Sequence, residues 1–136
     1  GDPSSSEITD YVVIGNLGNA VDWSGELTGT RRSPGSASDG SRGVWAGWYT
    51  PTGSNANIDY ITIGMVGMSA VNSGDLTVAR QRNDGVSDGN RGLFGGGYTS
   101  PLSDVIDYIA IAIDSDATDF GDLTAGRFAN AGASGT

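Results

Sequence analysis

The feature that most constrains this sequence is a segment that recurs along the chain. Its most regular copy runs from Ile58 to Arg91, and most of that copy has counterparts upstream and downstream. Each copy opens with a D-Y motif, and the three aspartates, Asp10, Asp59 and Asp107, are separated by 49 and 48 residues. A period near this length, with several short strands per copy, is typical of a propeller blade or a related array of β units. Since one such unit cannot bury its apolar faces alone, we expect neighbouring units to supply the core.

Apolar alternation within the copies predicts short β-strands. The expected strands cover residues 9–14, 21–27 and 43–50 in the first copy, 58–63, 75–79 and 92–98 in the second, and begin again at 106. Segments rich in Gly, Pro, Ser and Asp separate them and are predicted as loops or turns: SPGSASDGS, PTGSNAN and DSDATDFGD. No useful window has helical periodicity, so the predicted fold class is all-β.

We assign residues 1–136 to a single repeat domain. The repeats are placed at 8–57 and 58–105, with a partial repeat at 106–136 and a flexible polar lead-in at 1–7. A closed propeller needs at least about four blades. The expected architecture is therefore an incomplete propeller of units of about 47–50 residues, completed by oligomerisation because open ends expose strand edges. A β-prism-like domain of three sheets is the structural alternative.

The composition excludes several classes of function. The net charge of −9 argues against a nucleic-acid partner, because binding phosphate backbones requires clustered positive charge. The chain has no histidine and no cysteine, which removes disulfides, thiolate metal sites and histidine-dependent catalysis. No apolar run approaches the ~18 residues of a membrane-spanning helix. We predict a protein that is not an enzyme, needs no cofactor, and has neither nucleic-acid nor membrane partners.

The order of motifs within a unit resembles the Kelch repeat. Read from Arg80, the second unit has a turn at Asp88, a double glycine at Gly95, an aromatic strand at Tyr108 and an arginine at Arg127. Kelch blades carry a double glycine after the second strand, an aromatic in the third, an aromatic before the fourth and an arginine leading onward. The first unit departs from this pattern with Ala46-Gly47, and the second has Asn72 where the others have Trp23 and Phe120.

The motifs IDYxxIA, DFGDLTxxR and RGxFGGG also resemble repeats in long structural proteins of tailed bacteriophages, notably those of aquatic hosts. This resemblance covers nearly all of residues 9–127. It implies a virion component, such as a capsid decoration protein or a tail or fibre part, in a virion or extracellular location. Such a protein would have copies of itself and other virion proteins as partners. A fold of this kind serves many functions, so the resemblance alone does not fix one.

The repeated arginines are predicted to hold the units together. Arg31, Arg80 and Arg127 recur at fixed offsets from two series of acids. We expect them to pair either with Asp10, Asp59 and Asp107 or with Glu26, Asp75 and Asp122. The same structural role is expected for Arg42 and Arg91.

Two further groups are candidate ligand sites. Asp114, Asp116, Asp119 and Asp122 have the oxygen-rich spacing that a hard cation such as Ca²⁺ accepts, although the equivalent turns lack most of these acids. Trp45, Trp48 and Tyr49 lie within five residues, and alternation would place Trp48 on the opposite side from the other two. Because Gly97 replaces Trp48 in the second unit, Trp48 is the best candidate for a sugar-stacking contact.

The leading functional hypothesis is a non-enzymatic structural protein that acts through repeat packing and self-association. One alternative is an adhesion module that binds surface glycans through Trp48 and neighbouring loops. The other is a subunit of a self-assembling extracellular filament.

Overall fold

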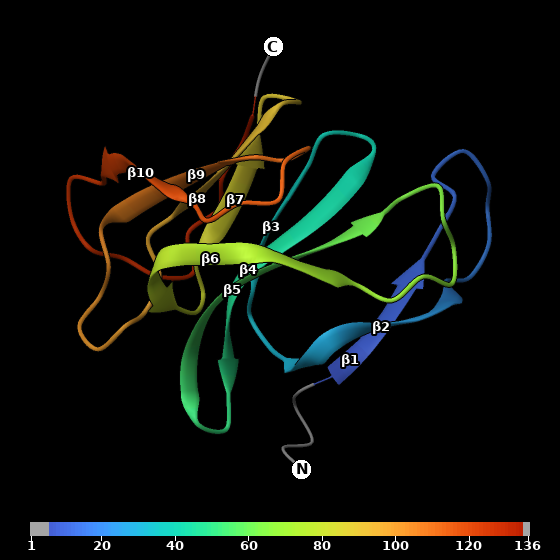
Figure 1. Ribbon diagram of the computed structural model, residues 1–136, viewed down its shortest axis with the longest axis horizontal. Helices are drawn as coiled ribbons and strands as arrows, with labels where there is room; N and C mark the ends of the chain where they lie inside the picture. The colour runs from blue at the N-terminus through green and yellow to red at the C-terminus, as the bar shows by residue number, and fades with distance from the viewer. Residues whose placement is uncertain (1–5, 135–136) are drawn as a thin grey trace.

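The computed structural model describes residues 6–134, and this part of the chain contains β-strands and no α-helix, which confirms the all-β prediction. The strands are β1 (Ser6–Tyr11), β2 (Val21–Arg31), β3 (Gly35–Ser38), β4 (Arg42–Thr50), β5 (Gly53–Thr62), β6 (Val71–Arg80), β7 (Asp84–Ser87), β8 (Arg91–Gly95), β9 (Val105–Ala110) and β10 (Thr118–Asp122). They form three antiparallel sheets, none of which closes on itself: β1-β2, β3-β4-β5-β6 and β7-β8-β9-β10 (Figure 1). The expected lead-in at residues 1–7 lies mostly outside the described residues, and its last two residues belong to β1.

Each four-stranded sheet is one sequence repeat, read from one repeated arginine to the next. The first sheet lies between Arg31 and Arg80 and the second between Arg80 and Arg127, and both are simple antiparallel meanders. The hairpin β1-β2 is equivalent to the last two strands of each four-stranded sheet, β5-β6 and β9-β10. A repeat boundary at residues 57 and 58 falls within β5, and one at 105 and 106 falls within β9. The hydrogen-bonded unit is therefore shifted by half a repeat relative to the boundaries assigned from sequence.

Two strands lie in segments that the composition predicts as loops. β3 occupies the middle of SPGSASDGS, and β7 is its counterpart in the next unit. Each is joined to the following strand by a tight turn, in which the Oδ1 of Asp39 or Asp88 accepts two backbone N–H groups. Such Asx turns bring the short segment back against its neighbour, and pairing then makes it a strand. Composition misses these strands because their Gly, Ser and Asp residues have low β propensity.

Two other expected turns also contain strand residues. PTGSNAN begins β5 at Gly53, and DSDATDFGD contains all of β10. Within β4 the register shifts between Ala46 and Trp48, where Gly47 has a φ of 58°. This β-bulge interrupts the strict alternation that the sequence predicts for Trp45, Trp48 and Tyr49.

The main core lies between the two four-stranded sheets. The first sheet contributes Val44, Ala46, Ile58 and Leu76, and the second contributes Phe94, Ile109 and Ile111. All are buried, and Ile58 and Phe94 have no exposed surface. The fold thus buries apolar surface between successive repeats, as expected of a repeat protein.

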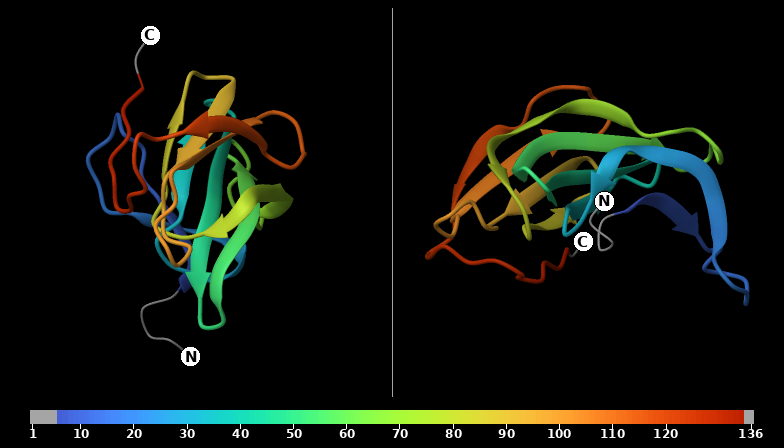
Figure 2. Two further views of the ribbon diagram at one scale, coloured as in Figure 1. Left: turned by 90° about the vertical axis from the view of Figure 1, so that its left-hand side faces the viewer. Right: turned by 90° about the horizontal axis from the view of Figure 1, so that it is seen from below.

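The three sheets follow one another in sequence order along the molecule. Figure 2 shows β1-β2 at one end, the first four-stranded sheet in the middle and the second at the other end. The loop between β1 and β2 extends away from the rest of the molecule (Figure 1). Within the described residues, no helix is long and apolar enough to cross a membrane.

Candidate interface

A buried ion pair joins β2 to the first four-stranded sheet. Arg31 ends β2, and its Nη2 lies 2.6 Å from Oδ2 of Asp59 on β5. The same guanidinium donates to Thr28 Oγ1 at 2.9 Å and to the Gly29 carbonyl at 3.1 Å, while Thr28 Oγ1 also donates to Asp59. Both charged side chains are almost fully buried. The cluster connects two successive units of the repeat, and we call it a clamp.

A second clamp repeats this geometry one unit later. Arg80 ends β6, and its Nη2 lies 3.0 Å from Oδ2 of Asp107 on β9, with neither side chain exposed. Thr77 supports the aspartate with its Oγ1 at 2.6 Å and its backbone N–H at 3.0 Å. Burial lowers the pKa of Arg80, and the Asp107 charge partly offsets that effect. Of the two series of acids considered from sequence, the structure pairs Arg31 and Arg80 with D-Y aspartates, Asp59 and Asp107.

The recurring threonine is a part of the clamp that the sequence interpretation missed. Thr28, Thr77 and Thr124 each stand three residues before the clamp arginine, within the repeated Leu-Thr motif. A hydroxyl at this position accepts from the arginine or donates to the aspartate, which helps to satisfy a buried charge. The constant spacing of three residues between this threonine and the arginine could have identified the threonine from sequence.

A separate contact joins the first four-stranded sheet to the segment that follows β9 of the second. Arg42 begins β4, and its Nη1 donates to the Ile111 carbonyl at 3.1 Å and to Asp114 Oδ1 at 2.7 Å. Its guanidinium also lies over the ring of Tyr60, 3.9 Å from the centroid. Arg42 on β4 therefore contacts the segment that follows β9 of the next unit. Its equivalent, Arg91, is exposed and lies over Tyr108.

Glycines allow the turn of each unit to rest on the strand of the preceding one. A Cβ at Gly25 on β2 would collide with the carbonyl oxygen of Met68, and a Cβ at Gly74 on β6 would collide with that of Ser115. Trp23 strengthens the first of these contacts, because its buried indole donates to the Met68 carbonyl at 2.8 Å. Only glycine permits backbone approach at this distance.

Arg127, the third arginine of the series, keeps the arginine and threonine of a clamp but lacks the aspartate. We call an incomplete clamp of this kind a half-clamp. Arg127 donates to Thr124 Oγ1 at 3.3 Å and to the Ala125 carbonyl at 3.2 Å, which is the arrangement that Arg31 makes with Thr28 and Gly29. Arg127 is exposed, and no carboxylate of residues 6–134 pairs with it. Gly121, the counterpart of Gly25 and Gly74, has nothing within 4 Å of an added Cβ.

The opposite half-clamp lies at the other end of the molecule. Asp10 occupies the position of Asp59 and Asp107, but it is exposed and pairs with no arginine of the described residues. In the hairpin, Asp10 is the cross-strand partner of Asp22. The structure therefore contains two complete clamps between one half-clamp of each kind.

The outer side of the second four-stranded sheet is an apolar surface, which the C-terminal segment partly covers through Asn130, Ala131 and Gly132. We call this surface the C-terminal face; its apolar residues are Val86, Leu93, Ile106, Phe120 and Leu123. Four of them line a hollow of about 240 Å³. Leu93, Ile106 and Leu123 are the counterparts of Val44, Ile58 and Leu76, which the second sheet covers completely. Leu93, Ile106 and Leu123 therefore occupy positions that belong to the core in the preceding unit, yet they are only half-buried here.

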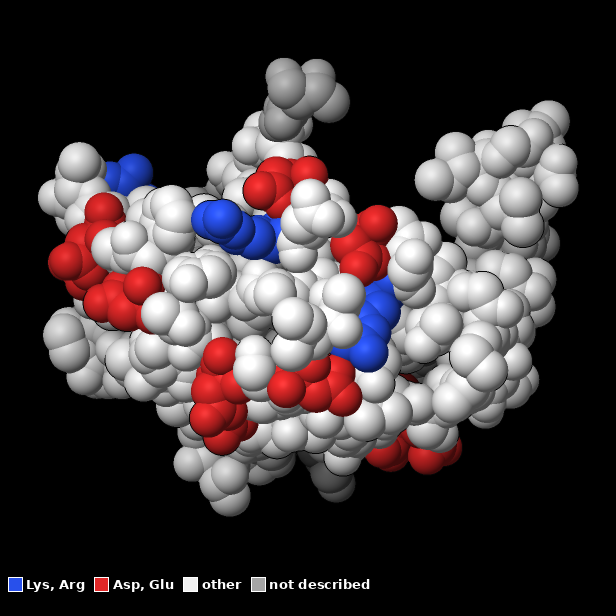
Figure 3. Space-filling view, turned by 45° about the horizontal axis from the view of Figure 1, so that its top comes forward, with Lys and Arg blue, Asp and Glu red and all other residues white. Residues whose placement is uncertain are grey.

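The hairpin β1-β2 has a second exposed apolar surface, which we call the N-terminal face. It consists of Asp10 with the apolar residues that follow it, Val12, Ile14 and Leu17. Val12 is 56% exposed, whereas its counterparts Ile61 and Ile109 are 8% and 3% exposed. In Figure 3, the projection at the right, where Figure 1 has the β1-β2 loop, carries no charged side chain. Acidic residues are instead scattered over the rest of the visible face, with few arginines among them.

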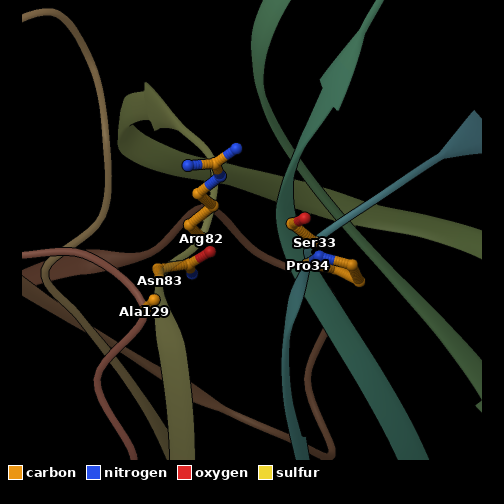
Figure 4. Close-up of a pocket in the computed structure, with 5 residues that line it drawn as sticks. All are labelled: Ser33, Pro34, Arg82, Asn83 and Ala129. Atoms are coloured by element: carbon orange, nitrogen blue, oxygen red, sulfur yellow. The ribbon is translucent and has the colours of Figure 1, made fainter. Parts of the chain in front are cut away.

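A separate hollow of about 300 Å³ lies where the two four-stranded sheets begin. It is lined by Ser33, Pro34, Arg82, Asn83 and Ala129 (Figure 4). Asn83 is buried with its amide directed toward Pro34, while the Arg82 guanidinium points away from that amide. Backbone bonds cross the hollow from Arg82 N to Ser33 O at 2.9 Å and from Ala129 N to Arg82 O at 3.0 Å. The residues that line this hollow thus mainly form the backbone contacts between successive units.

The four acidic residues considered for a cation do not converge. Asp114 pairs with Arg42, Asp116 Oδ1 accepts the Asp75 backbone N–H at 3.0 Å, and Asp119 Oδ1 accepts that of Gly121 at 2.9 Å. Asp122 pairs with Val105 in the β9-β10 ladder. Within residues 6–134, no three acidic side chains are grouped closely enough to hold a metal ion.

The aromatic cluster is largely committed to packing. Trp48 is 3% exposed, and the Arg31 guanidinium covers one face of its ring at 3.8 Å from the centroid. Tyr49 is half-buried beneath Arg32 at 4.1 Å, and Trp45 is half-buried. Sugar stacking needs an accessible ring face, so the burial of Trp48 removes the residue on which the glycan hypothesis mainly depended.

Comparison with protein-family models and with curated proteins finds no match for this chain.

Proposed function

We propose that this chain is a non-enzymatic structural protein that acts by packing repeats and by self-association. The observation that carries the proposal is the pair of half-clamps, with an arginine half at one end of the array and an aspartate half at the other. Inside the chain the same two halves form buried ion pairs between successive units. A surface with matching polar groups and an adjoining apolar area is suited to homotypic association.

The distribution of chemical groups supports this function over catalysis. The strongest polar clusters are the clamps, whose charged groups are buried between sheets and pair with one another. A catalytic side chain must be accessible to its substrate. The clamp residues instead contact the next unit, which is a structural role.

For the biological setting we propose a virion component, such as a capsid decoration protein or a tail or fibre part. The resemblance of the repeats to those of phage structural proteins supports this setting, and the two matched four-stranded units are consistent with Kelch-like blades. A ring completed by several copies would be an assembled propeller. A head-to-tail contact that does not close would give a filament.

Sedimentation velocity over a wide range of protein concentration tests the proposal. We expect the average mass to rise above the 13.8 kDa of one chain as the concentration increases. Electron microscopy of the concentrated sample then separates rings from filaments. A mass that stays at one chain up to the highest soluble concentration would contradict self-association.

A further inference from the structure

We infer that the hairpin β1-β2 of one copy docks on the C-terminal face of a second copy, with Asp10 of the first paired to Arg127 of the second. The inference rests on the proposed self-association and identifies the surfaces that meet. It follows from what the two complete junctions inside the chain have in common and from what each open end retains.

The charged groups of the two ends are complementary. In both complete junctions, an arginine at the end of a strand pairs with the D-Y aspartate of the following unit. Arg127 is already held by Thr124 and the Ala125 carbonyl in the way that Arg31 is held by Thr28 and Gly29. Asp10 is the one D-Y aspartate of the described chain that has no arginine. Placing Asp10 beside Arg127 forms a third clamp from existing parts.

The backbone surfaces are complementary as well. In the complete junctions, Gly25 receives the turn containing Met68 and Gly74 receives the turn containing Ser115. Gly121 has open space at the corresponding position. The β1-β2 loop of a second copy is the counterpart of those two turns, so it would rest on Gly121 and cover Phe120, which is 54% exposed.

The apolar surfaces continue the same pattern. Ile109 and Ile111 complete the core over the first four-stranded sheet. Their counterparts on the hairpin are Val12 and Ile14, which are exposed. On docking they would meet Ile106 and Leu123, whose own counterparts lie in that core. Within the described residues no strand equivalent to β4 or β8 accompanies the hairpin, so the hairpin would leave Leu93 partly open. This junction should therefore be weaker than those inside the chain.

Two charge reversals test the pairing directly. In Arg127→Asp every junction would bring two aspartates together, and in Asp10→Arg every junction would bring two arginines together. We expect each variant alone to associate at least about tenfold more weakly than the wild type, because like charges at a close contact cost more than 1.4 kcal/mol. In a mixture, every junction between one variant and the other joins opposite charges, so association should return on mixing.

Arg82→Asp is the matched control. It makes the same change of charge at an exposed arginine whose guanidinium lies over Phe128 and contacts neither Thr124 nor a carboxylate of residues 6–134. Its backbone bonds to Ser33 and Ala129 do not depend on the side chain, and aspartate tolerates its φ of 56°. Association of this variant should remain within about threefold of the wild type, a change below 1 kcal/mol. Circular dichroism should show each variant folded, because Asp10 and Arg127 are exposed.

A cross-link gives an independent readout that does not depend on charge. The 136-residue sequence has no cysteine, so its Asp10→Cys and Thr124→Cys variants carry one thiol each. Under mild oxidation we expect a disulfide-linked heterodimer when the two variants are mixed, and much less when Ser41→Cys replaces Asp10→Cys.

The outcomes separate this inference from the proposed function. Rescue on mixing together with the specific cross-link supports the docking described here. Wild-type association without rescue and without the cross-link would overturn the docking and leave self-association standing, through another surface. Absence of association in the wild type would overturn both.

Discussion

Arg80 Nη2 and Asp107 Oδ2 lie 3.0 Å apart, and neither side chain has any exposed surface, although the two residues belong to different four-stranded sheets. The pair also places Arg80 within 2.9 Å of the Phe94 carbonyl, beside the centre of the core. A charge in such a position is costly unless its partner is present. The ion pair therefore makes correct stacking of the two units a condition for folding.

The first prediction follows from this dependence. Asp107→Asn removes the partner of a buried arginine and should lower the free energy of unfolding by roughly 3–5 kcal/mol. Urea denaturation at low protein concentration measures it. Asp10→Asn makes the same change at the equivalent exposed aspartate and should alter stability by less than about 0.5 kcal/mol. Equal losses in the two variants would contradict the assignment of Asp10 as a half-clamp.

The second prediction concerns close approach of backbones on β2. Gly25→Ala adds a methyl group that collides with the Met68 carbonyl, so it should cost about 1–3 kcal/mol through displacement of the turn. Gly29→Ala lies on the same strand with nothing within 4 Å, and it should be neutral or stabilise by up to about 1 kcal/mol. Thermal unfolding of the two variants compares them. A milder effect at Gly25 than at Gly29 would rule out the contact.

The third prediction separates packing from ligand binding at the aromatic cluster. Trp48→Ala removes a buried ring that stacks on Arg31 and should cost about 3–5 kcal/mol. Phe120→Ala truncates an exposed ring and should cost less than about 1 kcal/mol in the monomer. Denaturant unfolding provides both values. A stable Trp48→Ala variant that had lost binding on a glycan array would return Trp48 to the role of a sugar contact.

The fourth prediction concerns acid sensitivity of the two Asx turns. Backbone N–H donation, most strongly from Arg42, lowers the pKa of Asp39, and donation from Arg91 and Asn90 lowers the pKa of Asp88. A carboxylate whose pKa is lower in the folded state contributes stability above its ordinary value of 3.8 and loses it as the pH falls below that value. Unfolding at several pH values should therefore show a smaller loss below pH 3.8 in the variant with Asn at both positions than in the wild type. Identical pH profiles would exclude this contribution.

Local sequence patterns located most of the sheet. Alternation in residues 58–63 and from residue 106 onward located the second half of β5 and most of β9, because apolar side chains repeat there with the period of a strand. Alternation did not identify β3 or β7, because residues such as Ser36 in β3 and Gly85 in β7 have no intrinsic preference for a strand. Those segments become strands only when an Asx turn and a neighbouring strand hold them.

The clamps show the same division. The sequence by itself determined the repeat, the all-β class and the recurrence of Arg31, Arg80 and Arg127 beside two series of acids, because these are properties of spacing. Only the tertiary structure decided that Asp59 and Asp107 are the partners and that Trp48 is buried. Pairing of charges and burial of rings depend on which units stack, and that is a contact between residues far apart in the chain. For the same reason, only the stacked sheets reveal that Asp10 and Arg127 are the unpaired halves of one repeated contact.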